Sequence, residues 1–152
     1  MTSANEIYAL LVPIQRQRLL LPRTAVREVV RYSKPEPIEN APDWLPGTIN
    51  WQNNKIPMIS FEGLCGKEMP EVNSRTRVAI MTALDKEMPH NAYAMYVEGF
   101  PQLIGIQEKD LGVDAEAKFP DNCPIISQLK LFNDRPQIPN LEYIEKKILQ
   151  QL

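Results

Sequence analysis

Short apolar runs alternate with turn-forming residues along most of the chain, a pattern typical of many short β-strands. The pattern leaves open whether a short helical turn starts at Thr24. Residues 137–139 are expected to pair only briefly. The pattern predicts strands over residues 7–12, 19–21, 26–30, 47–51, 56–59, 76–83, 92–97, 102–106 and 125–132.

A single helix is expected at the end of the sequence. Asn140 is a favourable N-cap residue, and the apolar residues that follow recur at helical spacing, which predicts a lid packed on the β structure. This stripe consists of Leu141, Ile144, Ile148, Leu149 and Leu152.

Other segments are predicted to be irregular. Residues 35–46 contain four prolines, so we expect an extended loop there. Residues 111–124 are polar and predicted irregular, and residues 1–6 are predicted to be a loose tail.

Residues 47–51 and 56–59 are predicted to form a hairpin around the polar turn 52–55. Asparagine tolerates the left-handed backbone that tight turns require. Trp44, at the end of the proline-rich loop, is expected to be a partly buried anchor, with a surface contact as the alternative. For Trp51 both a core position and a surface position remain open.

The amino-acid composition limits the classes of protein to which the chain can belong. The 152 residues suit one soluble domain with a real core, and fourteen prolines against six glycines favour an all-β fold. The net charge of −2 argues against nucleic-acid binding. The first residues lack a basic signal region and no apolar run reaches about 18 residues, so we expect a cytoplasmic protein without membrane insertion.

Residues for catalysis or cofactor binding are missing from the sequence. The single histidine, His90, lies in a polar loop and is expected to be exposed. Cys65 and Cys123 are too far apart for a metal or redox motif. We expect two reduced, partly buried thiols, with one disulfide as the alternative. There is no glycine-rich phosphate loop and no metal-ligand spacing. We therefore expect no enzyme activity and no cofactor.

Three motifs follow the apolar run 19–21 in a fixed order: VREV at 26–29, WLPGTIN at 44–50 and IPMI at 56–59. Together they resemble the CheW-like coupling domains of bacterial chemosensory systems. The resemblance is clear up to residue 65 and looser afterwards.

The resemblance implies a single CheW-like domain over residues 1–152, all-β, with two five-stranded SH3-like barrels around a shared core and a short C-terminal helix. It implies a non-enzymatic adaptor that joins the cytoplasmic tip of a chemoreceptor to the regulatory domain of a CheA-type histidine kinase. Strand alternation places Val26 with Glu28 on one face, so an exposed Glu28 implies an exposed Val26. The expected partner-binding residues are Val26, Arg27, Glu28, Val29, Ile49 and Gln52, with apolar packing as the alternative for Val26, Val29 and Ile49.

The chain departs from the family pattern in one turn and one strand end. Gln52-Asn53 stands where the family usually has Arg-Gly, and the arginine is a receptor-contact position. Ser60 stands where the family usually has aspartate. Residues 137–142 resemble the ChpC type of CheW-like protein, which accompanies type IV pilus (twitching) systems.

A second hypothesis is a free-standing SH3-like module that binds a proline-rich peptide. It predicts a solvent-facing aromatic groove, for instance one made of Trp44, Trp51 and Tyr96.

Overall fold

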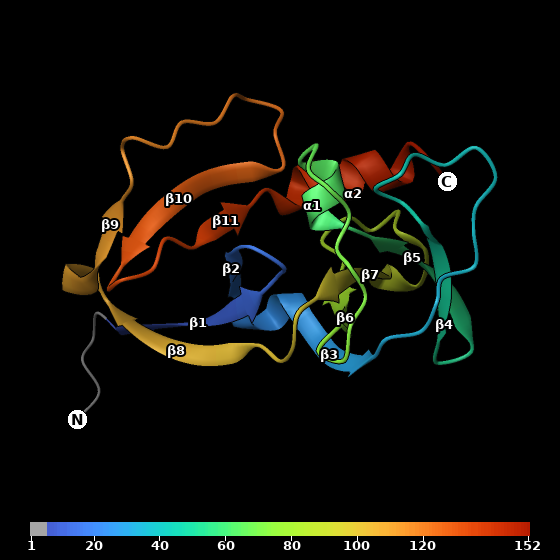
Figure 1. Ribbon diagram of the computed structural model, residues 1–152, viewed down its shortest axis with the longest axis horizontal. Coiled ribbons are helices and arrows are strands. Elements are labelled where there is room, and N and C mark those ends of the chain that lie inside the picture. Colours follow the sequence, from blue (N-terminus) through green and yellow to red (C-terminus); the bar gives the residue numbers. More distant parts are fainter. Residues whose placement is uncertain (1–5) are drawn as a thin grey trace.

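The computed structural model describes residues 6–152, which form two curved β-sheets with two α-helices where the sheets meet (Figure 1). The predicted loose tail covered residues 1–6; residues 1–5 lie outside the described range, and Glu6 already belongs to the first strand. The strands are β1 (Glu6–Pro13), β2 (Arg18–Pro22), β3 (Val26–Arg31), β4 (Gly47–Trp51), β5 (Asn54–Ile59), β6 (Arg77–Thr82), β7 (Ala92–Val97), β8 (Gln102–Gln107), β9 (Leu111–Val113), β10 (Ile125–Leu131) and β11 (Gln137–Pro139). The helices are α1 (Phe61–Leu64) and α2 (Leu141–Leu149), with 3-10 turns at Arg23–Ala25, Pro89–Asn91 and Glu108–Asp110.

One sheet has the strand order β8-β1-β2-β11-β10-β9. Its β1–β2 hairpin pairs Leu11 with Leu20 and Val12 with Leu19. The first pair packs inside this sheet, and the second pair packs in the core shared with the other sheet. Both faces of β2 are therefore buried, which explains why the run 19–21 contains no polar residue.

The other sheet has the order β3-β6-β7-β5-β4. The predicted alternation in residues 92–97 is confirmed, because Tyr93, Met95 and Val97 face the shared core. Ala94 and Tyr96 face a smaller core inside the sheet. The small alanine side chains suit the narrow interior of a curved sheet.

The shared core joins the two sheets. Leu19 and Leu21 of β2 meet Met81 of β6 there, and Ile144 and Ile148 of α2 close the same cluster. Each sheet also has its own small core. This arrangement matches the prediction of two β subdomains around a shared core.

The predicted hairpin forms, with a shorter turn than expected. Asn54 already pairs with Trp51, so only Gln52 and Asn53 make the turn. Both have positive φ angles, 49° and 65°, which a two-residue turn between twisted strands requires. Asn54 and Lys55 therefore belong to β5.

The predicted helix is present as α2. The Asn140 side chain accepts a hydrogen bond from the backbone nitrogen of Tyr143, as an N-cap does. Ile144 and Ile148 are fully buried, and Leu141 and Leu149 pack against the shared core. Leu152 was wrongly included in the stripe: the helix ends at Leu149, and Leu152 is 57% exposed.

Two short elements were missed. β9 lies within the segment that was predicted to be irregular and gives one sheet six strands instead of five. α1 has four residues and is capped by the Ser60 hydroxyl, which accepts from the Gly63 nitrogen. The proline-rich segment is a loop, as predicted, but it is only partly extended: Glu36 forms a bridge with Thr48, and turns follow at residues 39–40 and 43–44.

Candidate functional site

The expected partner-binding residues of β3 surround a β-bulge. Val26 pairs with Met81 and Glu28 pairs with Ile80, so Arg27 is an extra residue on β3. A bulge of this kind interrupts the two-residue alternation of side chains. The expectation that Val26 is exposed together with Glu28 is therefore wrong: Val26 is half-buried against the shared core, whereas Glu28 is exposed.

Arg27 and Glu28 both reach the indole of Trp51. The indole nitrogen donates a hydrogen bond to Glu28 Oε1 at 3.3 Å. The guanidinium carbon of Arg27 lies 5.4 Å from the centre of the Trp51 ring, within cation–π range. We call the surface where Arg27 and Glu28 lie against the buried Trp51 ring the Trp51 corner. Because β3 and β4 are the two edges of their sheet, these contacts also bring its edges together.

Arg27 is held from the other side as well. Its Nε donates to Thr82 Oγ1 at 3.3 Å. The amide orientation of Asn91 that satisfies its hydrogen bonds lets its nitrogen donate to the Ala83 carbonyl at 3.0 Å, while its oxygen accepts from the Arg27 guanidinium at 3.2 Å. The guanidinium is thus oriented on the surface before any partner binds.

The remaining expected contact residues occupy different environments. Gln52 is exposed at the tip of the β4–β5 turn, next to the corner. Val29 is half-buried against the shared core. Ile49 is 5% exposed and packs in the small core of its sheet. Of the six residues, Arg27 and Glu28 are brought together over Trp51, Gln52 is exposed in the turn that follows Trp51, and the apolar ones serve packing.

The aromatic groove predicted by the peptide-binding hypothesis is not formed. Trp51 and Tyr96 are 8% and 7% exposed and fill the small core. Trp44 is half-buried against the shared core, which confirms its predicted role as an anchor. These rings therefore offer no common surface to a proline-rich peptide.

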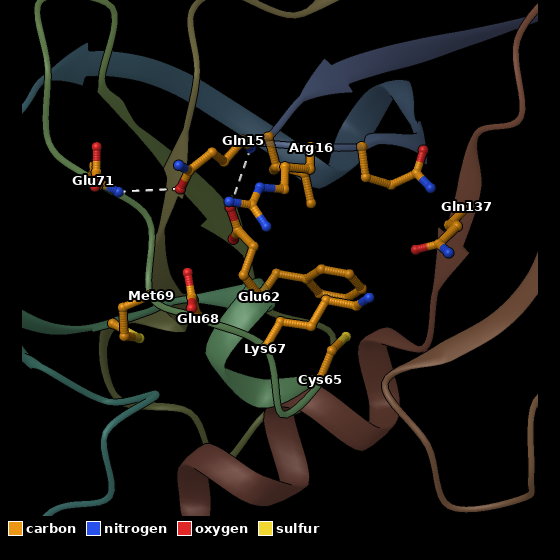
Figure 2. Close-up of a pocket in the computed structure, with 12 residues that line it drawn as sticks. Gln15, Arg16, Glu62, Cys65, Lys67, Glu68, Met69, Glu71 and Gln137 are labelled. Atoms are coloured by element: carbon orange, nitrogen blue, oxygen red, sulfur yellow. Dashed lines mark hydrogen bonds between the residues drawn. The ribbon is translucent and has the colours of Figure 1, made fainter.

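A second candidate site is a cleft of about 300 Å³ between the two sheets (Figure 2). The β1–β2 turn lines one side, and α1 with the loop after it lines the other. The turn and α1 are tied together, because the Gln15 nitrogen donates to Glu62 Oε2 at 3.2 Å. The Glu71 nitrogen in turn donates to Gln15 Oε1 at 3.1 Å.

Glu62 is the unusual residue of this cleft. Its side chain is largely buried, and burial raises the pKa of its carboxyl above the ordinary value, with the Glu98 carboxylate as a weaker cause in the same direction. Its Oε1 is buried without a hydrogen-bond partner among residues 6–152. Sequence reasoning missed Glu62, because a single glutamate beside an apolar residue carries no signal of burial.

The cysteines and the histidine offer little chemistry. Cys65 and Cys123 are free and half-buried, as expected. Burial raises the pKa of Cys65 to about 11, so its thiol stays protonated near neutral pH and is a poor nucleophile. His90 is exposed in its loop, as expected.

Comparisons with known proteins settle the family. A family model described as the CheW-like domain matches residues 9–131. The chain belongs to the CheW-like domain family. The crystal structure of the scaffolding protein TtCheW from Thermoanaerobacter tengcongensis has the same fold, with a TM-score of 0.71 and 19% identity over 88% of this chain and 84% of that chain. A comparison with curated protein sequences gives no match.

Membership in the CheW-like family confirms the resemblance seen in the motifs and extends it well beyond residue 65. It supports the role of a chemotaxis adaptor. No helix within residues 6–152 is long and apolar enough to cross a bilayer.

Two departures from the family pattern have a simple physical explanation. Ser60, which stands in place of the usual aspartate, is buried and caps α1 through its hydroxyl. Serine and aspartate are both strong N-cap residues, so this exchange preserves the local structure. Asn53, in place of the usual glycine, adopts the positive φ that the turn needs.

Proposed function

We propose that this CheW-like protein is a non-enzymatic adaptor that couples the cytoplasmic tip of a chemoreceptor to the regulatory domain of a CheA-type histidine kinase. The observation that carries the proposal is the Trp51 corner, where Arg27 and Glu28 are exposed side by side on a β-bulge. Both are held by the Trp51 ring, so opposite charges are presented in a fixed order. Fixed charges of this kind favour one register of a docking partner.

The receptor tip is proposed to bind at the Trp51 corner. Glu28 would meet a basic or polar group of the receptor and Arg27 an acidic one. Since Thr82 and Asn91 already orient Arg27, little side-chain entropy is lost on binding. Val26, Val29 and Ile49 support this surface from below through packing.

Gln52 is where this adaptor is expected to differ from its relatives. An arginine at the tip of the turn would add a charge-assisted hydrogen bond, and glutamine supplies only a neutral amide. We therefore expect a weaker receptor contact than an arginine would give, or a receptor with a different polar group opposite position 52.

The kinase side of the proposal uses a different surface. Binding of the regulatory domain at the end of one sheet would leave the Trp51 corner free for the receptor. The chain would act as one domain, because the shared core draws on both sheets and α2. The adaptor would operate in the cytoplasm. That the adaptor controls a type IV pilus is a prediction, based on the ChpC-like sequence at residues 137–142.

Titration calorimetry tests the coupling function. The purified chain is titrated with the regulatory domain of its host's CheA-type kinase and, separately, with a folded receptor-tip fragment. Micromolar or tighter binding of both is the expected result. No kinase binding even at high protein concentration would contradict the coupling function.

Two matched variants test the receptor surface. Glu28→Lys should weaken receptor binding about tenfold or more and leave kinase binding unchanged, because it places like charges beside Arg27. Glu39→Lys makes the same charge change at an exposed position in the proline-rich loop and should leave both affinities unchanged. Gln52→Arg should strengthen receptor binding. Equal losses of receptor affinity in Glu28→Lys and Glu39→Lys would show that the Trp51 corner is not part of the receptor interface.

A further inference from the structure

The cleft between the two sheets contains a buried acceptor that the adaptor function does not use. Glu62 is 8% exposed, and its Oε2 is satisfied by the Gln15 nitrogen. Its Oε1 has no hydrogen-bond partner among the described residues 6–152. A buried carboxylate oxygen left unpaired is costly, so a donor that reached it would gain strongly.

Two basic side chains stand at the mouth of the same cleft. Arg16 belongs to the β1–β2 turn and Lys67 to the loop after α1, so they come from opposite sides of the cleft (Figure 2). Neither forms an ion pair with any residue between 6 and 152. Both are exposed, so their long side chains can rotate to admit a ligand.

The rest of the lining includes an apolar surface. Ile14 and Phe61 are buried and Met69 is half-buried, and all three line the cleft. The volume of about 300 Å³ lies at the small end of the range for ligand pockets. A molecule with a short apolar chain would fill this space.

We propose that the cleft binds a small zwitterion of the amino-acid class. Its ammonium group would donate to Glu62 Oε1, its carboxylate would lie near Arg16 and Lys67, and its side chain would pack against Phe61. Glu68 and Glu71 also line the cleft, but only a molecule that carries both charges can pair with the buried Glu62 carboxylate and with Arg16 and Lys67 at the same time. This inference does not depend on the receptor and kinase contacts proposed above.

A matched ligand series tests the charge requirement. Norleucine carries both charges on a short chain, pentylamine lacks the carboxylate, and hexanoate lacks the ammonium group. Titration followed by backbone-amide NMR should show saturable shifts for norleucine in residues 14–17 and 61–67. The two single-charge compounds should bind about tenfold more weakly or worse. Absence of saturable norleucine shifts up to its solubility limit would overturn the proposal.

Variants of the same charge type test the role of Glu62. Glu62→Gln should lose at least about tenfold in norleucine affinity, since the amide cannot pair with an ammonium as a carboxylate does. Glu108→Gln changes an exposed glutamate in the 3-10 turn between β8 and β9 and should bind as the natural chain does. Equal norleucine affinity in the natural chain and Glu62→Gln would overturn the assignment. If Glu62→Gln fails to fold, the ligand series on the natural chain still tests the proposal.

Discussion

Gly47 lies where two backbone segments approach closely. A Cβ atom at this position would be 2.0 Å from the Glu36 carbonyl oxygen. That carbonyl accepts from the Thr48 nitrogen at 2.9 Å, and the Glu36 nitrogen donates to the Thr48 carbonyl at 2.8 Å. The glycine of the WLPGTIN motif is therefore required so that the proline-rich loop can pair with β4.

Gly47→Ala is expected to destabilise the fold by about 1–3 kcal/mol or more, because the backbone of Glu36 must move away. Urea unfolding followed by tryptophan fluorescence measures the change. Gly112→Ala is the control, since the nearest atom to its added Cβ is Lys130 Cβ at 3.9 Å. Equal losses in the two variants would contradict the steric explanation.

Glu62 should make stability depend on pH. Its carboxyl has a raised pKa in the folded chain, so the folded state holds the proton more tightly than the unfolded state does. The contribution of Glu62 to stability is therefore greatest when the group is protonated, and it falls as the pH rises above the ordinary value of 4.5.

Glu62→Gln should remove this dependence, because glutamine does not titrate and its amide oxygen can still accept from Gln15. Relative to the natural chain, the unfolding free energy of the variant should rise as the pH rises above 4.5. Urea titrations at several pH values give the difference between the two chains. A difference that does not change with pH would show that burial of Glu62 does not control its titration.

At the scale of elements, the start of α2 depends on one side chain. The Asn140 oxygen accepts from the Tyr143 nitrogen at 3.1 Å. Asn140→Ala should cost about 1 kcal/mol of unfolding free energy, whereas Asn140→Gly should cost only a few tenths, because glycine is tolerated at the N-cap. Thermal or urea unfolding of the three chains measures this order. A larger loss for glycine than for alanine would contradict the N-cap role.

The bulge in β3 shows how one inserted residue changes a binding surface. In a regular strand, Arg27 and Glu28 would point to opposite faces. The shift in register between Val26 and Glu28 lets both reach Trp51. The element thus presents two opposite charges together while its valines stay in contact with the cores.

At the scale of the whole molecule, the two sheets share their largest core. Residues of β1 and β2 pack there with residues of β6 and β7, and α2 contacts both groups. Neither sheet can lose its structure without exposing the apolar surface of the other.

We therefore expect a single unfolding transition for the chain. Tryptophan fluorescence reports on Trp44 and Trp51, and NMR signals of the β1 and β2 amides report on the other sheet. Both probes should give the same urea midpoint and the same slope. Loss of the β1 and β2 signals at lower urea than the fluorescence change would show two independent units.

Much of the fold follows from local patterns in the sequence. Alternation of apolar residues located most strands, the prolines marked a loop, and Asn140 marked the start of α2. These features depend on neighbouring residues and on intrinsic backbone preferences, which the sequence contains directly. The elements that were missed, β9 and α1, are three and four residues long, too short to produce a periodic signal.

Local sequence patterns predicted the candidate sites less well than the fold. Arg27, Glu28 and Gln52 are exposed, and their role in partner binding stays a prediction. Alternation misplaced Val26, because a bulge arises from pairing with β6. Ile49 and Trp51 became core residues because the curved sheet closes around them. Nothing in the sequence marks Glu62 as buried, since its cleft is formed by segments that meet only when the two sheets pack.

The sequence by itself thus determined most strands and the final helix, because local residue preferences control them, and its motifs identified the family. Only the tertiary structure decided which charged side chains meet at the Trp51 corner and which carboxylate lies in the cleft. Those properties depend on contacts between residues far apart in the chain, such as Glu28 with Trp51 and Gln15 with Glu62.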